Sequence, residues 1–372
     1  MKYIHILDEF SLAGGGVRSV VSDVSKTMVS KGLDVYIFTL TVPQDVSTAE
    51  INAWASENNI RFDILGNGSG ALLKATLRLR RIMKELCKDD ECCLYMHLKK
   101  GVLMGILSTL CLKNAKRVEV YHSGYLRYKL QAFLCKPFIR HYIAVSKDAK
   151  SQLVQQFEIK PEKVTVAYNG VDLDGIRSKA IDKRGVHDKV RFLTIGRLAY
   201  PKNIDLSVEA YAKLVLRGKE DLSEYLVAGD GPDRKMIEEK ATGTVNFLGL
   251  INRDSVCSQL ASADIVVFPS LWEGNSIALL EAIAVGTVLL VTDIPSFREV
   301  LGNQPLSEQE LFRPEPFGAV FHKDRVESCV AAMDYLIRNK DLFQTMKKFV
   351  GDLAENYTLE KQCQSYLNVA SL

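Results

Sequence analysis

The stretch ADIVVFPSLWEGNSIALLEAIAVGTVLLVTD, residues 263–293, predicts a parallel β-α-β unit. Residues 265–269 form an apolar run rich in β-branched side chains, as expected for a strand that is buried on both faces. A loop follows over residues 271–275, and residues 277–285 then read as a buried helix that ends at Gly286. Because residues 288–292 form a second apolar strand, the helix begins just beyond a strand's C-terminal edge, where open α/β sheets bind ligands.

The predicted start of this helix combines anion-binding groups with two carboxylates. The backbone N–H groups of Asn275, Ser276 and Ile277 have no partner within the helix, and the helix dipole favours an anion there. Glu273 precedes the helix and Glu281 lies within it, and carboxylates accept hydrogen bonds from hydroxyl groups. A ligand that is part phosphate and part polyol, such as a nucleotide-sugar, fits both features. The alternative is a solvated loop acid and an ordinary helix acid.

The E-x7-E spacing of Glu273 and Glu281, after an apolar strand that ends in proline, resembles the retaining glycosyltransferases of family 4, which have the GT-B fold. The resemblance implies that Glu281 holds the ribose hydroxyls and that Glu273 lies near the donor sugar and diphosphate. This chain has Gly274-Asn275-Ser276 where the family commonly has GFG or GFP. Residues at this place contact the sugar in the family, so the resemblance leaves the donor sugar open. It predicts a nucleotide-sugar contact for Gly274, Asn275, Ser276 and Ile277.

The length of 372 residues exceeds one typical core and predicts two domains. With the resemblance, we expect an α/β protein of the GT-B class with two Rossmann-like domains facing an interdomain cleft. The acceptor-binding domain would span residues 1–170 and be completed by a C-terminal helix over 356–372. A linker over 171–189, charged and without firm periodicity, would lead to the nucleotide-sugar-binding domain over 190–355.

The composition predicts a cytoplasmic protein. The apolar run near the N-terminus is too short for a signal peptide, and the uncharged run over residues 101–112 is shorter than the roughly 20 residues that span a membrane. The eight cysteines are scattered without a C-x-x-C pair, which argues for reduced thiols rather than a zinc site or disulfide framework. We therefore expect no metal and no cofactor.

A basic stretch suggests a location at the inner face of the plasma membrane. Lys and Arg greatly outnumber Asp and Glu between Ala71 and Lys150, and Arg78, Arg81, Lys84 and Lys88 recur at helical spacing. Such a field attracts anionic lipid, and we expect peripheral contact with an anionic membrane. Solvated helix faces are the alternative. No nucleic-acid partner is expected, because no recognition motif or interleaved aromatic platform accompanies the charge.

The N-terminal half offers a glycine loop and a histidine at ligand-binding positions. The loop at Gly14-Gly15-Gly16 follows the first predicted strand, and the resemblance assigns Gly15 and Gly16 to the donor phosphate and acceptor side; a plain tight turn is the alternative. Predicted strands end at His97 and at His122. The segment His122-Ser123-Gly124 resembles the family's "vHg" motif, which implies that His122 contacts the transferred sugar. His97 matches a family histidine of less defined role.

The C-terminal half carries the predicted diphosphate site. A strand over residues 190–195 ends at Gly196-Arg197, with Lys202 shortly after, and a guanidinium fork beside a point charge suits a diphosphate. The passage resembles the family's "GRL…KN" motif, which implies that Arg197 and Lys202 hold the leaving group. By the same resemblance Gly229 belongs to a "GxGP" turn, and residues 250–251 line the base pocket with backbone groups. Those two residues are Leu250 and Ile251.

One apparent metal motif is interpreted as structural. Asp172-Leu173-Asp174 spells D-x-D, but it lies in the predicted linker rather than at a buried strand end. No metal ligand is assigned there.

Together these features predict a metal-independent retaining hexosyltransferase that works on a glycan or lipid-linked acceptor in polysaccharide or glycolipid synthesis. Arg197, Lys202 and the helix start at Ser276 would stabilise the leaving diphosphate, with His122 and Glu273 at the sugar. No carboxylate in the N-terminal half is marked as a nucleophile, so front-face attack is the expected route. The alternatives are a sugar-nucleotide epimerase of the same fold and a catalytically inactive sugar-nucleotide-binding subunit.

Overall fold

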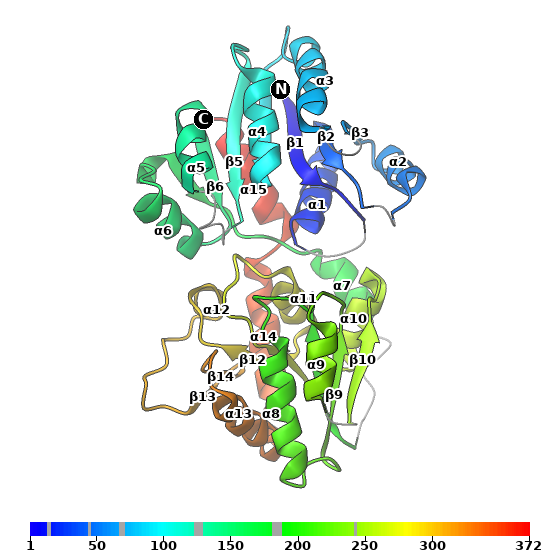
Figure 1. The fold of residues 1–372 in the computed structure, drawn as a ribbon. Coiled ribbons are helices and arrows are strands. Elements are labelled where there is room, and N and C mark those ends of the chain that lie inside the picture. Colours follow the sequence, from blue (N-terminus) through cyan, green and yellow to red (C-terminus); the bar gives the residue numbers. More distant parts are fainter. Residues whose placement is uncertain (13–15, 44–45, 67–70, 123–128, 181–187, 242–243) are drawn as a thin grey trace. The chain divides into compact units, whose positions relative to one another are not determined.

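The computed structural model describes residues 1–12, 16–43, 46–66, 71–122, 129–180, 188–241 and 244–372 (Figure 1). The chain divides into two compact units. Unit 1 comprises Met1–Gly170 and Leu359–Leu372, and unit 2 comprises Val171–Thr358. Each unit is a seven-stranded sheet with helices on both faces. These are the two Rossmann-like halves of a GT-B protein.

Unit 1 contains a fully parallel sheet in the order β3-β2-β1-β4-β5-β6-β7. The strands are β1 (Lys2–Glu9), β2 (Asp34–Thr41), β3 (Arg61–Ile64), β4 (Cys92–His97), β5 (Ala115–Tyr121), β6 (His141–Ala144) and β7 (Val164–Val166). The helices are α1 (Val17–Ser30), α2 (Thr48–Glu57), α3 (Ala71–Leu86), α4 (Leu98–Thr109), α5 (Lys129–Cys135), α6 (Lys147–Gln156) and the C-terminal α15 (Leu359–Ala370). Every residue of β4 is buried, as a central strand with helices on both faces requires.

Two glycines let α4 pack directly onto the centre of this sheet. A Cβ atom at Gly101 would lie 2.7 Å from the carbonyl oxygen of Ile6, and one at Gly105 would lie 2.4 Å from the Met96 sulfur. The Asp8 carboxylate fixes the same helix by accepting a hydrogen bond from the Gly101 N–H at 2.6 Å. The start of α4 is therefore held at the C-terminal end of β1.

Helix α15 completes unit 1 although it follows unit 2 in the chain. Tyr95 of β4 donates a hydrogen bond to the carbonyl oxygen of Tyr366 at 2.7 Å, and both rings are fully buried. The Gly170 N–H donates to the Gln362 side chain at 2.8 Å, which ties the end of the first segment to the returning helix. Helix α15 therefore covers the part of the sheet around Tyr95, beside α1.

Unit 2 repeats the arrangement with one antiparallel edge strand, in the order β10-β9-β8-β11-β12-β14-β13. The strands are β8 (Val190–Ile195), β9 (Ser223–Ala228), β10 (Val245–Gly249), β11 (Ile265–Phe268), β12 (Val288–Thr292), β13 (Phe312–Glu315) and β14 (Gly318–Phe321). The helices are α7 (Leu173–Ala180), α8 (Ile204–Leu216), α9 (Arg234–Lys240), α10 (Arg253–Ser262), α11 (Ile277–Val285), α12 (Pro295–Leu301), α13 (Val326–Arg338) and α14 (Phe343–Leu353). The predicted unit over residues 263–293 is present as β11, α11 and β12.

Residues 173–180 of the predicted linker over 171–189 form helix α7 and belong to unit 2, whereas residues 181–187 lie outside the described part of the chain. Ile176 and Ala180 are buried, and the Arg177 side chain reaches the carbonyl oxygen of Ala284 in α11. The Asp172 carboxylate accepts a hydrogen bond from the Gly175 N–H at 3.0 Å and so caps the start of α7. The D-x-D sequence is structural at this residue, as expected. In the part of the chain that is described, no helix is both long and apolar enough to cross a bilayer.

The close packing of α4 gives a stability prediction with a matched control. Gly101→Ala should destabilise the protein by about 2 kcal/mol, because the new methyl group meets the backbone of β1. Gly351→Ala in α14 places its methyl group in open space and should stabilise by about 0.5–1 kcal/mol, because alanine favours helix. Denaturant unfolding of the two variants measures whether each change lowers or raises the free energy of unfolding. Equal stability of Gly101→Ala and wild type would contradict this packing.

Candidate functional site

In unit 2 the residues that are predicted to bind the nucleotide-sugar gather where the order of the strands in the sheet reverses. Strands β8 and β11 are neighbours, and the sheet continues from them to β9 on one side and β12 on the other. The loops after β8 and β11 therefore diverge at the C-terminal edge, which is the usual ligand position in such sheets. The Leu271 N–H donates to the Pro201 carbonyl oxygen at 2.9 Å and holds the two loops together.

An ion pair joins these two loops. Lys202 Nζ lies 2.5 Å from Glu273 Oε1, and the Ser270 hydroxyl donates to the same oxygen at 2.8 Å. The Lys202 stem passes over Gly196, where a Cβ atom would come within 3.7 Å of it. Both charged side chains are largely removed from solvent. Two residues predicted to act on the diphosphate and the sugar thus contact each other directly.

Arg197 stands apart from this pair. Its side chain is exposed, and none of the side chains that the structure describes pairs with its guanidinium. Its neighbour Leu198 is fully buried and anchors the loop through backbone hydrogen bonds to Asp230 and Asp233. An exposed, free guanidinium on an anchored loop is available to an anionic ligand.

The start of α11 carries buried polar groups. Asn275 and Ser276 are 7% and 6% exposed, and the Ser276 hydroxyl has no hydrogen-bond partner among the described residues. Ser276 occupies the N-cap position without capping the helix through its side chain. A buried hydroxyl left without a partner is costly, so a ligand oxygen at this helix start would relieve that cost. Ile277 is the first helical residue, and Gly274 is half-buried in the loop before it.

Glu281 lies one turn further along α11. Its side chain is buried, with Arg253 Nε of α10 3.9 Å from Oε1. Helix α10 begins just after Leu250 and Ile251, of which Leu250 is 79% exposed and Ile251 is half-buried. Helix α10 packs against α11. The predicted ribose-binding acid Glu281 therefore lies on the helix next to the one that Leu250 and Ile251 precede.

Gly229 acts through its backbone. Its φ is 141°, and a Cβ atom there would lie 1.9 Å from the Gly196 carbonyl oxygen, so no other residue fits. Its N–H donates to the Gly249 carbonyl oxygen at 2.8 Å, and the Gly196 N–H donates to the Ala228 carbonyl oxygen at 3.0 Å. Gly229 thus sets the spacing of the loops after β8, β9 and β10.

In unit 1, the sheet also reverses its strand order between β1 and β4. Gly16 follows β1, has a φ of 76° and stands at the N-cap position of α1. Gly15 lies outside the described residues. His122 follows β5 and bonds to His97 at the end of β4, and His97 bonds in turn to His5 of β1. The two histidines singled out from the sequence are therefore neighbours, and a third joins them.

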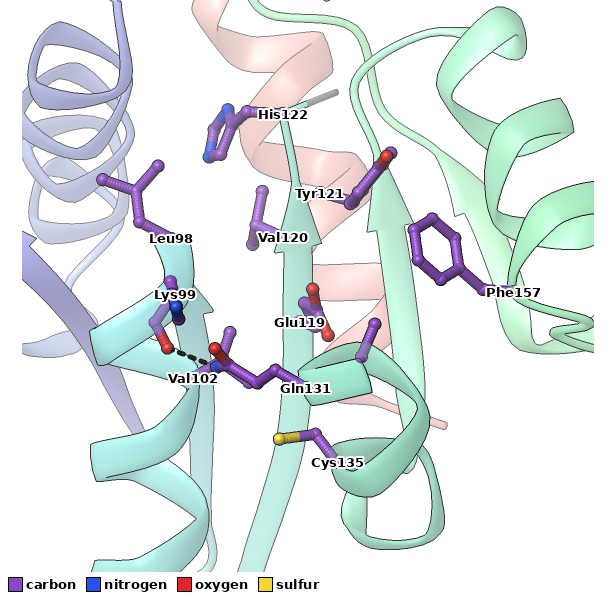
Figure 2. A pocket seen from close by; sticks show the side chains of 11 residues that line it. Leu98, Lys99, Val102, Glu119, Val120, Tyr121, His122, Gln131, Cys135 and Phe157 are labelled. Carbon is purple, nitrogen blue, oxygen red and sulfur yellow. Dashed lines mark hydrogen bonds between the residues drawn. The ribbon is translucent and has the colours of Figure 1, made fainter. Parts of the chain in front are cut away.

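A pocket opens in unit 1 between β5, α4 and α5 (Figure 2). It encloses about 530 Å³, including space open to solvent. Its polar lining includes Glu119, Gln131, Lys99 and His122, and the Gln131 amide donates to the Lys99 carbonyl oxygen at 2.7 Å. Burial raises the pKa of Glu119 to about 7.

Sequence reasoning missed Glu119 and His5. Glu119 interrupts the apolar run of β5, and an acid inside a predicted buried strand was the signal that could have identified it. His5 lies in the middle of β1, and no local pattern distinguishes it from a satisfied core histidine. Only the registers of β1 with β4 and of β4 with β5 bring it into line with His97 and His122.

Comparison with known proteins gives consistent results. The family described as "Glycosyltransferase Family 4" matches residues 14–174, and that described as "Glycosyl transferases group 1" matches residues 177–351. An uncharacterized glycosyltransferase of Methanocaldococcus jannaschii is 30% identical over 218 residues, 54% of this chain and 55% of that protein.

A second curated relative is N-acetylgalactosamine-N,N'-diacetylbacillosaminyl-diphospho-undecaprenol 4-alpha-N-acetylgalactosaminyltransferase of Campylobacter jejuni. It is 30% identical over 208 residues, 54% of this chain and 52% of that protein. The chain thus spans about half the length of these relatives. The crystal structure of Anabaena HepE in complex with UDP superimposes with a TM-score of 0.78 at 15% identity, covering 100% of both chains, which supports the fold.

The raised pKa of Glu119 gives a pH-dependent stability prediction. The folded protein keeps the Glu119 proton up to about pH 7, whereas the unfolded chain releases it near its ordinary value. Wild type should therefore lose about 1–2 kcal/mol relative to Glu119→Gln as the pH rises from 5 to 8, with the partial exposure of Glu119 limiting the size. Denaturant unfolding at both pH values measures this difference. The control is Glu162→Gln, which removes an exposed carboxylate of unit 1. If the two substitutions change the pH dependence of the free energy of unfolding equally, Glu119 is solvated and its pKa is not raised.

Proposed function

Because this chain belongs to the family 4 glycosyltransferases and has the GT-B fold, we propose that it transfers a hexosyl group from a nucleotide-diphosphate sugar to a glycan or lipid-linked acceptor, with retention of configuration. The observation that carries the proposal is the cluster at the strand-order reversal of unit 2. There Arg197 and Lys202 follow β8, Glu273 and the buried start of α11 follow β11, and the Lys202–Glu273 pair joins the two loops. This combination suits a ligand with both anionic and hydroxyl groups.

The diphosphate would bind to the cations and to the start of α11. Arg197 offers a fork of N–H donors that no described side chain occupies, and α11 offers the N–H groups of its first turn and the Ser276 hydroxyl. Lys202 would exchange part of its interaction with Glu273 for the phosphate as negative charge develops on the leaving group. Glu273 would then be released toward the sugar hydroxyls.

The nucleoside would lie toward α10. Glu281 is a buried carboxylate with acceptor capacity for two ribose hydroxyls, and the neighbouring Gly249–Ile251 turn offers backbone groups to the base. A related fold binds UDP in Anabaena HepE, which supports a nucleotide ligand but does not define the base for this chain.

Retention would proceed by front-face attack. Glu119, the acid of β5 that lines the same pocket as His122, keeps its proton up to about pH 7 because burial raises its pKa. A protonated carboxyl group is not a nucleophile, which supports a mechanism without a carboxylate nucleophile from β5. The acceptor hydroxyl would then be deprotonated with the help of the leaving diphosphate, with no metal required.

The donor-site proposal is tested by titrating UDP-, GDP- and ADP-sugars into purified protein by calorimetry. Glu281→Gln should weaken binding of the preferred nucleotide by about 1–3 kcal/mol, since an amide satisfies only part of the hydroxyl bonding. Lys202→Ala should lower turnover by roughly 10² or more, because its contact matters most as the diphosphate leaves.

Lys213→Ala is the matched control for these donor-site variants. Lys213 pairs with Glu327 on the surface of unit 2, and its substitution should change neither the nucleotide affinity nor the turnover. Unchanged affinity and turnover in both site variants would show that the donor site is elsewhere. Release of a rearranged sugar without acceptor would indicate an epimerase, and nucleotide binding without any turnover an inactive subunit.

We further propose that the acceptor is lipid-linked and that unit 1 meets an anionic membrane. Helices α3, α4 and α5 lie side by side on one face of the unit 1 sheet. We call the outer surface of these three helices the apolar-basic surface. It exposes Leu73, Leu77, Leu107, Leu130, Phe133 and Leu134, with Leu130 72% and Phe133 66% exposed. Among these apolar groups lie the exposed cations Lys74, Arg81, Lys84, Lys99 and Lys100.

This surface revises the predicted basic helix face. Arg78 makes two hydrogen bonds to the Asp63 carboxylate, at 2.8 and 2.9 Å, and so is not free for lipid, while Lys88 lies beyond the end of α3. Exposed apolar side chains beside cations are typical of surfaces that lie on bilayers. The Campylobacter jejuni relative is named for a diphospho-undecaprenol substrate, which supports a membrane-held acceptor.

Co-sedimentation with phosphatidylglycerol liposomes tests the membrane proposal. Wild type should sediment at low salt and be released at about 0.5 M, because each nearby cation contributes about 1 kcal/mol of screened attraction. Arg81→Glu with Lys84→Glu should abolish sedimentation, and Leu130→Ser with Phe133→Ser should weaken it. Leu216→Ser removes a still more exposed leucine of unit 2 and should have no effect. Wild type that stays in solution at low salt would contradict the proposal.

A further inference from the structure

Three histidines form a continuous chain across the centre of the unit 1 sheet. His5 Nδ1 lies 3.0 Å from His97 Nε2, and His97 Nδ1 lies 3.0 Å from His122 Nε2. The rings are stacked at 24° and 27° with centroids 5.3 Å apart in each pair. They come from β1, β4 and the end of β5, which are adjacent strands. His5 and His97 are fully buried, whereas His122 is partly exposed and lines the pocket of Figure 2.

All three rings are neutral at physiological pH. Burial lowers the pKa of His5 to about 3 and that of His122 to about 4, and it holds the pKa of His97 well below the ordinary range. A neutral imidazole has one N–H and one bare nitrogen. Each of the two N···N contacts is a hydrogen bond only if one partner donates and the other accepts. The ring proton must therefore be on the same nitrogen in all three histidines, either on every Nδ1 or on every Nε2.

Two arrangements satisfy this condition, and the inner end of the chain distinguishes them. In the first arrangement His5 donates to His97 and His97 donates to His122, so that each ring carries its proton on Nδ1 and His5 Nε2 is a bare acceptor. In the second arrangement His122 donates to His97 and His97 donates to His5, so that each ring carries its proton on Nε2 and His5 Nε2–H is a buried donor. His5 Nε2 has no partner among the described residues, and the His5 ring packs beside the Tyr95 and Tyr366 rings. A buried N–H without an acceptor is the rarer and costlier defect.

We infer that His5 and His97 are positioning residues that hold His122 in its Nδ1–H form, so that His122 presents a hydrogen-bond donor to the substrate. This role rests on the proposed transferase function, in which His122 contacts the transferred sugar. A fixed donor stabilises a sugar hydroxyl or a developing negative charge, and it cannot accept the proton of an incoming acceptor. His122 is thereby a donor and not a general base.

The proton positions are measured directly by long-range ¹H–¹⁵N correlation NMR of histidine-labelled protein at pH 7. The expected result is a protonated Nδ1 and a bare Nε2 in His5, His97 and His122. Sequential assignment uses His5→Phe, His97→Phe and His122→Phe. A protonated Nε2 in His122, or a mixture of its two forms, would overturn the inference. This measurement needs no substrate, so it stands whether or not the transferase proposal holds.

Substitution of His97 separates positioning from simple packing. In His97→Asn the side-chain amide can replace Nδ1–H as the donor to His122, whereas His97→Phe cannot donate. We expect His97→Phe to leave His122 in mixed forms and to lower kcat about tenfold, with KM for the nucleotide-sugar changed less than twofold. His97→Asn should restore the Nδ1–H form of His122 and most of kcat.

His141→Phe is the matched control, because His141 is a buried histidine of the same sheet that bonds to Thr165 at 2.9 Å outside the chain. It should leave kcat unchanged. Equal loss of kcat in His97→Asn and His97→Phe, with the His122 form unchanged in both, would show that His97 only fills space. If no variant shows transfer with any donor, the NMR result alone decides the inference.

Discussion

The constraint on which the rest of the structure depends is the parallel pairing of the central strands in both sheets. Parallel neighbours need crossover helices, and those helices bury both faces of each central strand. Side chains of the central strands are therefore unavailable to a ligand along most of their length. Chemistry can begin only at the carboxyl edge, and adjacent loops diverge there only at the point of reversal. The Lys202–Glu273 pair occupies this position in unit 2, and in unit 1 the histidine chain runs from the middle of β1 to the carboxyl ends of β4 and β5.

The local elements were predictable from the sequence because their signals are local. The β-branched run before Pro269, the apolar helix after Ser276 and the glycine at 286 each specify a backbone conformation by themselves, and β11, α11 and β12 follow them closely. The motif residues after β8 and β11 were predictable as a set, because carboxyl ends of parallel strands share an edge. The family resemblance then supplied the roles that remain proposals here.

Other features depend on contacts that no local pattern encodes. Helical spacing places Arg78 on a basic helix face, but its partner Asp63 lies on the separate strand β3. Helix α7 is short and charged, and its stability comes from packing against α10 and α11 rather than from periodicity. The same is true of His5, whose place in the chain follows from strand register. Contacts between segments that are far apart in the chain cannot be predicted from the local pattern of a single sequence.

Helix α15 has a consequence for synthesis on the ribosome. The chain leaves unit 1 at Gly170 and returns to it only at Leu359, after all of unit 2 has been made. Tyr366 and Gln362, which contact Tyr95 and Gly170, emerge only after the whole of unit 2. Unit 2 can fold as soon as it leaves the exit tunnel, whereas the unit 1 sheet lacks until then the part of its cover that α15 supplies. Unit 1 therefore completes its fold after unit 2, although its strands are translated before those of unit 2.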